Sequence, residues 1–352
     1  MIDKDFWRGK RVFLTGHTGF KGSWISLWLN YLGAEVKGYS LDPVSSISLY
    51  DIFKIKDFIN SEINDIRQKT LLAESINSFK PEIIIHMAAQ PLVQDSYEFP
   101  IETYETNVMG TANILDAARK CNSVEAILCI TTDKCYENNE LDIGYKEDDR
   151  MGGSDPYSSS KGCCELLINS FRKSFFEKEN IGLASARAGN VIGGGDWSKN
   201  RLIPDILRSF QESEIAQIRN PESVRPWQHV LESLNGYLIL LQNLTKNKKD
   251  FSGGWNFGPL DEDIKKVSEI ANIMKENWEG ADWIKSSASL NYESKLLKLN
   301  ISKALTHLDW SPVWNIEDSI KRIISWHKAW MKKEDMKDFS LNEIKEFMKD
   351  AN

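Results

Sequence analysis

Short apolar runs alternate with amphipathic segments along the first half of the chain. The apolar runs, which predict buried strands, cover residues 11–16, 35–41, 82–89, 125–132 and 182–193. Between them, apolar residues recur at helical spacing over residues 23–33, 101–121 and 157–178. This alternation predicts an α/β fold, with a Rossmann-type doubly wound parallel sheet and helices on both faces. Ligands of such a sheet bind beyond the carboxyl ends of its strands.

The pattern becomes less regular after about residue 190. Loop-like stretches rich in Gly, Arg, Trp and Pro come first, and helical segments follow at 230–245, at 263–278 and from 317 onward. Because no repeat or low-complexity linker separates the two halves, we expect a smaller α/β lobe that is interleaved with the sheet domain. The expected sheet domain comprises residues 1–188, rejoined by about 228–256, and the expected lobe comprises 189–227 and 257–352.

The composition is that of an ordinary soluble globular protein, with 41% hydrophobic and 27% charged residues in a chain of 352. The formal charge of −7 argues against nucleic acid or an anionic membrane as a partner. No apolar run approaches the roughly 18–20 residues that span a bilayer, and the charged N-terminal segment lacks the apolar core of a signal peptide. Five cysteines without C-x-x-C spacing and five scattered histidines lead us to expect a cytoplasmic protein without disulfides or a metal site.

Three glycines, Gly16, Gly19 and Gly22, lie between the first predicted strand and the first predicted helix. A tight turn, close approach of the backbone to a pyrophosphate and close helix–strand packing each exclude a β-carbon. The start of the helix also offers free N–H groups to phosphates. The spacing G-x-x-G-x-x-G departs from G-x-G-x-x-G, and such turns also occur as plain connections. The motif nevertheless favours dinucleotide binding.

Two acidic residues extend this motif. Asp42 follows the second predicted strand, where an acid binds the ribose hydroxyls of NAD and disfavours the extra phosphate of NADP. A turn residue before Pro43 is an equally good interpretation of this aspartate. Asp65 is placed to reach an adenine amino group, although a solvated loop aspartate fits the sequence nearly as well. We therefore expect NAD as the cofactor.

Tyr157 and Lys161 lie four residues apart at the start of a predicted helix and so share one of its faces. A neighbouring ammonium and a positively charged nicotinamide ring would both lower the pKa of the tyrosine and make it a usable base. Pairs with this spacing also occur on ordinary helix surfaces. The place of this pair, after the glycine motif and after Thr132 at a strand end, favours a catalytic role.

Together with Asn107 in the preceding predicted helix, these motifs resemble the extended short-chain dehydrogenases/reductases, over residues from about 8 to 335. Longer strings are similar to the nucleotide-sugar 4,6-dehydratases, and in particular to their CDP-glucose branch: "GHTGFKGSW", "HMAAQPLV", "TTDKCY", "DPYSSSKGCCE", "ARAGNVIGGGDW", "RLIPD" and "VRPWQHV". The same loops supply the remaining expected contacts to NAD, which come from Thr18, Phe20, Lys21, Ile66, Ala88, Ala89, Gln90, Asn107 and Thr131.

The resemblance implies net lyase activity on CDP-glucose, because NAD is reset within each turnover. Tyr157 would take the proton of the sugar 4-hydroxyl while hydride passes from C4 to NAD. Lys161 would assist the tyrosine and hold the nicotinamide ribose, and Thr132 would bind the reacting hydroxyl. Water is then lost across C5 and C6, and hydride returns to C6. The product is a 4-keto-6-deoxy sugar for deoxysugar biosynthesis, such as that of lipopolysaccharide O-antigen.

Elimination requires a base for the C5 proton and an acid for the departing 6-hydroxyl. Asp133 is the candidate acid, provided that burial keeps it protonated, and Lys134 is the candidate base, provided that it is neutral. The dTDP-glucose dehydratases have Asp-Glu here, so the lysine departs from their pattern and is the residue expected of the CDP-sugar branch. A structural Asp–Lys ion pair at a loop is the alternative.

The second lobe must supply cations for the substrate diphosphate, and arginine grips phosphate oxygens in bidentate fashion. By resemblance, Arg225 is the first candidate for a diphosphate or ribose contact, and Asn190 is the second. The other candidate substrate contacts are Gln90, Arg201, His229 and Asn256. A structural role fits each of them about as well. Trp197 and Trp227 either stack on a base or pack in the core, which is the commoner use of tryptophan.

A 4-epimerase, or a dehydratase of a dTDP-, GDP- or UDP-hexose, is the nearest alternative. An epimerase would need the Tyr–Lys pair and NAD but no acid–base pair after Thr132, so Asp133 and Lys134 favour dehydration. A non-catalytic dinucleotide sensor commonly lacks the Tyr or the Lys, and both are present here. The resemblance also implies a homodimer or a higher homo-oligomer through residues 102–121 and 157–176, although these helices equally suit packing within one chain.

Overall fold

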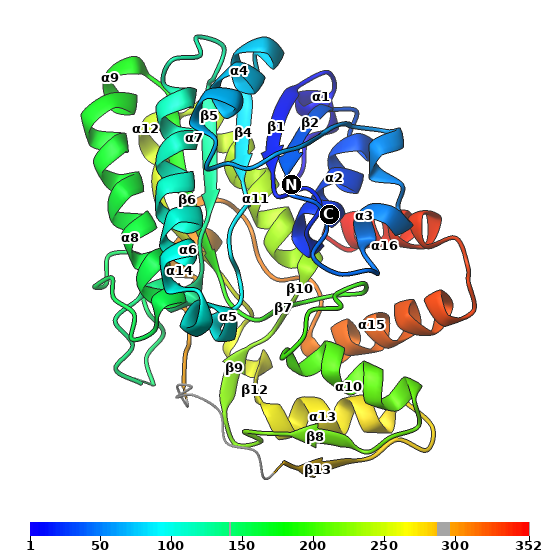
Figure 1. The fold of residues 1–352 in the computed structure, drawn as a ribbon. Coiled ribbons are helices and arrows are strands. Elements are labelled where there is room, and N and C mark those ends of the chain that lie inside the picture. The colour runs from blue at the N-terminus through cyan, green and yellow to red at the C-terminus, as the bar shows by residue number, and fades with distance from the viewer. Residues whose placement is uncertain (141, 287–295, 352) are drawn as a thin grey trace.

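The computed structural model describes residues 1–140, 142–286 and 296–351 (Figure 1). Within these residues, seven parallel strands form the central sheet in the order β11-β6-β5-β4-β1-β2-β3. Their bounds are β1 Arg11–Thr15, β2 Glu35–Ser40, β3 Asn60–Ile63, β4 Ile83–His86, β5 Ala126–Ile130, β6 Gly182–Ala188 and β11 Gly253–Phe257. The strand order reverses at β1, which confirms the predicted doubly wound α/β fold.

Side chains of each strand alternate between two hydrophobic cores. In β1, Val12 and Leu14 pack in the core on one face of the sheet, and Phe13 packs in the core on the other. Val12 pairs with Val36 of β2 and with Ile83 of β4. Because both faces are covered, the inner strands are apolar at nearly every position, which explains the apolar runs in the sequence.

Helices cover both faces of the sheet (Figure 1). One face carries α4 (Lys69–Phe79), α7 (Gly110–Ala118) and α8 (Pro156–Phe171), and the other carries α2 (Phe20–Tyr31), α11 (Val230–Lys246) and α16 (Met336–Asp350). The rings of Trp28 in α2 and Phe347 in α16 lie 5.8 Å apart. The last helix of the chain therefore packs beside the first strand–helix unit, and both termini lie on this side of the molecule (Figure 1).

A smaller lobe with its own hydrophobic core follows β6 (Figure 1). Its longer helices are α10 (Leu202–Gln211), α13 (Val267–Glu276) and α15 (Ile316–Met331). Its short strand pairs are β7 (Val191–Ile192) with β10 (Gln228–His229), β9 (Val224–Pro226) with β12 (Ile264–Lys266), and β8 (Ala216–Ile218) with β13 (Trp283–Lys285).

Short helices also occur throughout the described chain. They include α1 (Lys4–Trp7), α3 (Leu49–Ile52), η1 (Ile55–Asp57), α5 (Val93–Glu98), η3 (Asp133–Cys135), α9 (Glu177–Glu179), α12 (Lys248–Phe251), η5 (Asp261–Asp263) and α14 (Ser302–His307).

Several elements differ from the sequence expectation. The helix expected over 101–121 is divided into α6 (Pro100–Tyr104), a π-helical segment η2 (Glu105–Met109) and α7. A second π-helical segment, η4 (Arg172–Phe176), follows α8. Such π-helical turns are rare and occur frequently at functional sites. The edge strands β3 and β11 were not predicted, because β3 is short and only partly buried and β11 begins with two glycines.

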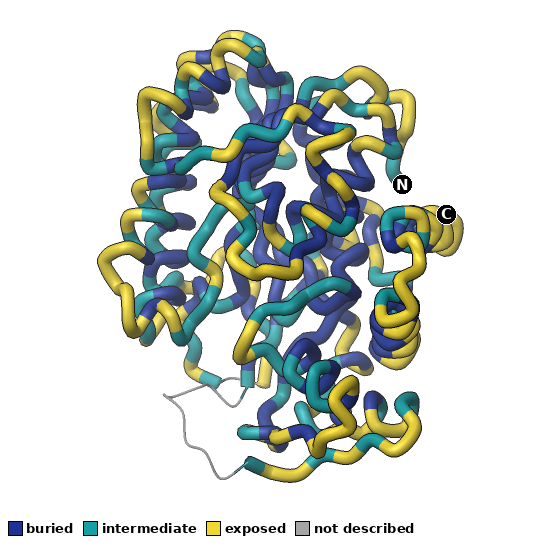
Figure 2. The backbone as a smooth tube through the Cα atoms, turned by 45° about the vertical axis from the view of Figure 1, so that its right-hand side comes forward, coloured by how far each residue is buried: buried dark blue, intermediate teal, exposed yellow. Residues whose placement is uncertain are grey.

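Burial follows these layers. Figure 2 shows the buried segments concentrated inside the molecule and the exposed residues along its outer turns. Among the described residues, no helix combines the length and the apolar character that crossing a membrane requires. The same residues contain no cluster of His, Cys, Asp and Glu that could hold a metal ion.

Candidate active site

The turn between β1 and α2 leaves no room for side chains at two of its glycines. A β-carbon on Gly16 would lie 2.8 Å from the amide nitrogen of Ala88, and Gly16 has a φ of +78°. A β-carbon on Gly22 would overlap the Gly16 carbonyl. Gly19, the exposed N-cap of α2, gives the helix no side-chain cap within the described chain. The first amides of α2 are therefore open to a ligand, and this cradle fits the pyrophosphate of a dinucleotide.

Thr18 ties this turn to the end of β2. Its Oγ1 donates to the Leu41 carbonyl at 2.9 Å and lies 2.9 Å from Ser40 Oγ. Asp42 comes next in the chain and is exposed. The acidic group thus lies beside the glycine turn, where a ribose contact is geometrically reasonable, and that contact stays a prediction.

Asp65 lies beyond the end of β3 and is paired within its own turn. Its carboxylate accepts hydrogen bonds from Arg67 Nη2 at 2.6 Å and from the Arg67 amide at 2.8 Å. Burial works to raise the pKa of Asp65, but Arg67 outweighs it and holds the pKa below its ordinary value. Its neighbour Ile66 packs directly against Gly110 of α7, where a β-carbon would overlap the isoleucine side chain. An adenine contact by Asp65 stays a prediction.

Asn107, in the π-helical segment, fixes the loop after β4. Its Oδ1 accepts from the Gln90 amide at 2.8 Å, and its Nδ2 donates to the Gln90 carbonyl at 3.2 Å and to Ser160 Oγ at 2.9 Å. The Gln90 side chain bonds to Leu92 of its own loop and to Thr103 of α6, so the structure does not direct it toward a substrate. Asn107 therefore acts as a buried clamp that holds the stretch with Ala88 and Ala89 over the glycine turn.

The four residues after β5 have different hydrogen-bond partners: Thr131, Thr132, Asp133 and Lys134. Thr131 Oγ1 donates to the buried Glu165 at 2.5 Å. Thr132 Oγ1 donates to Asp133 Oδ1 at 2.9 Å and accepts from the Lys134 amide at 3.3 Å. Asp133 is 2% exposed, and its Oδ2 has no hydrogen-bond partner among the described residues. Nor does the Lys134 ammonium pair with any described side chain, so the alternative of a structural Asp–Lys ion pair is not formed.

Tyr157 and Lys161 lie on the first turns of α8, whose N-terminus is capped by Asp155. Burial raises the pKa of Tyr157, and the neighbouring Thr132 side chain opposes that rise. Burial lowers the pKa of Lys161, whose Nζ donates to the Ile130 carbonyl at 3.3 Å. Burial of Tyr157 thus outweighs the effects that lower its pKa, which come from Thr132 and Arg201.

Lys21 interacts electrostatically with Asp133 and with two other cations, Lys161 and Arg201. Lys21 lies in the first turn of α2, and burial lowers its pKa to about 7, with further lowering by Arg201 and Lys161. Asp133 acts on Lys21 in the opposite direction. Arg201 is the N-cap residue of α10 in the smaller lobe and pairs with Asp196 at 3.1 Å, and its charge also lowers the pKa of Tyr157. The fold therefore brings cations from α2, α8 and the smaller lobe to one place, as an anionic substrate requires.

Arg225 and Asn190 lie on the segments that join the two parts of the molecule. Arg225 is 3% exposed on β9, and its Nη1 donates to the Val224 carbonyl at 2.9 Å. Asn190 follows β6 with a φ of +39°, and its carbonyl accepts from the Gln228 amide at 3.3 Å. Substrate contacts by these two residues stay predictions.

His229 and Asn256 lie in the core rather than at this site. His229 is fully buried, and its ring lies 5.1 Å from that of Trp314. Asn256 is also fully buried, and its Nδ2 donates to two backbone carbonyls. Trp197 packs against other tryptophans, and Trp227 lies in the core of the smaller lobe. These four residues therefore have the packing or structural role that the sequence analysis gave as the alternative to substrate binding.

Three residues that contact the segment after β5 were not recognised from the sequence: Glu165, which binds Thr131; Arg187, which binds Tyr136; and Gly189, which packs against Asp133. Glu165 lies four residues after Lys161 and hence on the same face of α8, which was a usable clue. Arg187 lies on β6 and Gly189 in the loop after it, and no spacing rule connects either residue with the turn after β5.

The comparisons with known proteins agree with this geometry. A family model described as GDP-mannose 4,6 dehydratase matches residues 13–323. The chain therefore belongs to this family, within the extended short-chain dehydrogenases/reductases. CDP-glucose 4,6-dehydratase of Salmonella typhimurium (strain LT2) is 54% identical to it over 99% of each chain.

Two solved structures establish the same fold at low sequence identity. UDP-glucose 4-epimerase from Thermotoga maritima, solved with UDP-glucose, superposes with a TM-score of 0.80 at 18% identity, covering 91% of this chain and 99% of that one. The dTDP-glucose 4,6-dehydratase from Bacillus anthracis, solved with NAD, gives a TM-score of 0.75 at 19% identity, covering 93% and 98%.

Proposed function

We propose that this protein is a NAD-dependent CDP-glucose 4,6-dehydratase, a lyase that forms CDP-4-keto-6-deoxyglucose. The observation that carries the proposal is the turn after β5. There a buried carboxyl group with one unpartnered oxygen, Asp133, touches the Tyr157–Thr132 pair and precedes an ammonium group, Lys134, without a partner among the described residues. An epimerase requires only the Tyr–Lys pair, whereas elimination of water requires both additional groups. The 54% identity with the Salmonella enzyme supports the choice of substrate.

Each catalytic side chain has a distinct task. Tyr157 removes the proton of the sugar 4-hydroxyl, which Thr132 holds beside it. Lys161, buried behind the tyrosine, binds the nicotinamide ribose and stabilises the tyrosinate. Lys134 takes the C5 proton, which the neighbouring ketone makes acidic, and Asp133 protonates the departing 6-hydroxyl.

The glycine cradle fits NAD. Gly16 and Gly22 leave room only for backbone, and Gly19 exposes the amides of α2 to a pyrophosphate. Asp42 would bind the adenosine ribose, and Lys161 would bind the nicotinamide ribose. Bound NAD would supply the acceptor for the C4 hydride and return that hydride to C6.

The nucleotide diphosphate would lie against the smaller lobe. Arg201 is close enough to act electrostatically on Tyr157 and Lys21, which places a cation within reach of an anionic substrate. Arg225 and Asn190 lie on the segments that lead into the lobe, and would contact the diphosphate or the ribose of CDP.

The experiment incubates the protein with NAD and, separately, with CDP-, dTDP-, GDP- and UDP-glucose, and follows the 4-keto-6-deoxy product. We expect product from CDP-glucose, and a loss of about 10²-fold or more for Tyr157→Phe. A 4-epimer as the product would favour an epimerase, product from another nucleotide alone would change the substrate, and no product from any of them would refute the dehydratase.

We also propose a homodimer in the cytoplasm that supplies a 4-keto-6-deoxy sugar to deoxysugar biosynthesis, such as that of lipopolysaccharide O-antigen. Large apolar side chains are exposed on adjacent helices: Ile101 of α6 is 70% exposed, Met109 of η2 is 55% exposed and Leu166 of α8 is 62% exposed. Exposed apolar residues on packed helices mark an interaction surface, and a second copy of the chain is the partner that the resemblance implies.

A further inference from the structure

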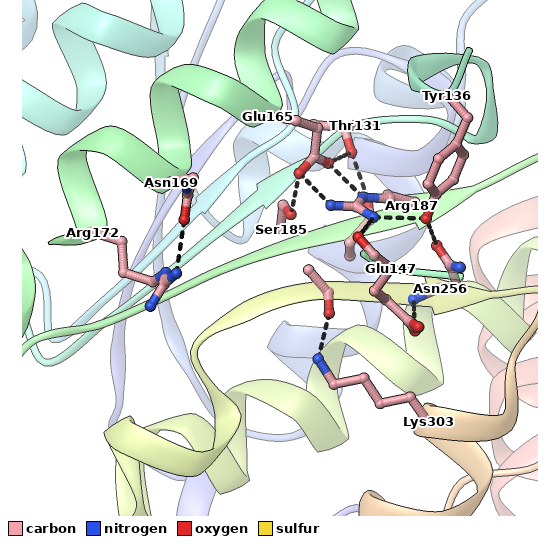
Figure 3. A network of polar contacts seen from close by, with 12 residues as sticks. Thr131, Tyr136, Glu147, Glu165, Asn169, Arg172, Ser185, Arg187, Asn256 and Lys303 are labelled. Atoms are coloured by element: carbon pink, nitrogen blue, oxygen red, sulfur yellow. Dashed lines mark hydrogen bonds and ion pairs between the residues drawn. The ribbon is translucent and has the colours of Figure 1, made fainter. Parts of the chain in front are cut away.

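A buried ion pair lies behind the turn that carries Thr132, Asp133 and Lys134 (Figure 3). Arg187 Nη2 lies 2.7 Å from Glu165 Oε2, and the two side chains are only 5% and 4% exposed. Arg187 Nε donates to the other oxygen of Glu165 at 2.9 Å, which makes the contact bidentate. Such a pair holds both side chains in one orientation.

Each member of the pair holds one end of the turn. Thr131, directly before it, donates its Oγ1 to Glu165 Oε1 at 2.5 Å. The hydroxyl of Tyr136, directly after it, accepts from Arg187 Nη1 at 2.6 Å and donates to Asn256 Oδ1 at 2.8 Å. Figure 3 shows both contacts meeting at the guanidinium–carboxylate pair. Residues 132–135 are therefore held at both ends, because Thr131 binds Glu165 and Tyr136 binds Arg187 of the same ion pair.

One member of the pair, Glu165, belongs to α8, the helix that also carries Tyr157 and Lys161. Glu165 lies four residues after Lys161 on α8, one turn farther along the same face. We propose that Glu165 and Arg187 are positioning residues that hold the acid–base turn at a fixed place relative to Tyr157 and Lys161. This inference rests on the proposed function, because it assigns the turn to elimination and α8 to oxidation at C4.

Loosening one end of the turn would affect the two chemical stages unequally. Tyr157 and Lys161 stay in α8, whereas Asp133 and Lys134 lose their place over C5 and C6. Elimination then slows more than oxidation at C4. A displacement of about 1 Å in a catalytic group lowers a rate by about 10²-fold.

The test uses Tyr136→Phe and Thr131→Val, each of which removes one bond to the turn. Glu165 and Arg187 themselves are left intact, because an unpaired buried charge endangers folding. Ser185→Ala is the matched control, because Ser185 Oγ donates to the same carboxylate at 2.8 Å but does not contact the turn.

Two measurements are made on all three variants. Hydrogen exchange of the amides of residues 132–136 is expected to accelerate in Tyr136→Phe and Thr131→Val, and to stay at the wild-type rate in Ser185→Ala. With CDP-glucose, we expect kcat to fall by about 10- to 100-fold in the first two variants. The isotope effect from deuterium at C5 should rise and that from deuterium at C4 should fall, because elimination becomes the slow stage.

Exchange and isotope effects that are the same in all three variants would refute the positioning role. An equal slowing of both stages would also refute it, because a merely structural loss does not discriminate between C4 and C5. If the wild-type protein makes no 4-keto-6-deoxy product, the proposed function fails. The exchange measurement then still decides whether the ion pair holds the turn.

Discussion

The carboxylate of Asp133 packs directly against the backbone of Gly189, in the loop after β6. A β-carbon on residue 189 would overlap Oδ2 and Cγ of the aspartate. Since Asp133 is enclosed on its other sides, Gly189→Ala must displace it. We expect kcat for CDP-glucose to fall by about 10²-fold while substrate affinity stays close to that of the wild type.

Gly258→Ala is the matched control for this substitution. A β-carbon on Gly258 would meet its neighbours at 3.5 Å or more, which is an ordinary van der Waals contact. Equal activity of the two alanine variants, measured by steady-state kinetics on folded protein, would show that the position of Asp133 does not matter for catalysis.

Thr132 is expected to set the pH dependence of the base. Burial raises the pKa of Tyr157, so the fraction of tyrosinate, and with it kcat/KM, is still rising with pH above the neutral range. The Thr132 side chain opposes this rise of the pKa. Thr132→Val should therefore move the ascending limb of the kcat/KM profile to higher pH. A profile that keeps the wild-type midpoint would contradict this role.

Lys134 is expected to exchange the C5 proton with solvent. Lys134→Met removes the nitrogen and shortens the side chain by that one atom only. In deuterated water we expect the variant to lose solvent deuterium at C5, and product formation to fall by about 10²-fold or more. Mass spectrometry of the sugar measures the label. Unchanged incorporation at C5 with a normal elimination rate would assign the base to another group.

A buried carboxyl group on the inner face of α16, that of Glu343, should make stability depend on pH. Glu343 Oε1 lies 3.3 Å from His229 Nε2 but is not aligned for a hydrogen bond with it. Burial raises the pKa of Glu343 from its ordinary 4.5 to about 8. A raised carboxyl pKa stabilises the fold fully below pH 4.5, and this stabilisation is lost as the pH rises to about 8. Glu343→Gln removes the titration.

The difference in free energy of unfolding between wild type and Glu343→Gln should change between pH 4.5 and 8 by at most about 1.4 kcal/mol per pH unit. Urea denaturation at several pH values measures it. Glu346→Gln is the control, because Glu346 lies on the same helix, is 63% exposed and pairs with Arg322 at 2.9 Å. If the stability of both variants follows the wild-type pH profile, Glu343 does not titrate in this range.

The apolar surface of α8 should control self-association. Leu166→Lys places a charge at a position that is 62% exposed, and we expect it to convert the proposed dimer into a monomer in sedimentation experiments. Ile143→Lys is the control, because Ile143 is 75% exposed in the loop that precedes α8. A monomeric wild-type protein, or equal association of both variants, would remove α8 from the interface.

The sequence predicts the sheet well because burial on both faces leaves continuous apolar runs. Local spacing likewise reveals the glycine turn, the Tyr157–Lys161 pair and the turn at Asp133. The edge strand β3 leaves no such record, since it is half exposed. The π-helical segment cannot be read from spacing either, because its residues make contacts with distant parts of the chain, such as those of Asn107 with Gln90 and Ser160.

Candidate substrate residues were harder to rank because the sequence does not show how deeply each side chain is buried. His229 and Asn256 have the chemistry of ligand-binding residues, but both are fully buried in this fold. Arg201, a weaker candidate by sequence, is the one that acts on Tyr157 and Lys21. Glu165 and Arg187 are linked only by strand pairing and helix packing, so their connection with the turn appears only in three dimensions.

The position of β11 at the edge of the sheet also constrains how this protein is made. β6 ends at Ala188, but its outer neighbour begins only at Gly253, after much of the smaller lobe has been synthesised. During translation the outer edge of β6 therefore keeps unpaired backbone N–H and C=O groups until β11 is made. Such unpaired edges promote pairing with other chains and misassembly. Nascent chains that stall within this interval should be the ones that aggregate or need a chaperone, whereas chains that have passed Phe257 can close the sheet.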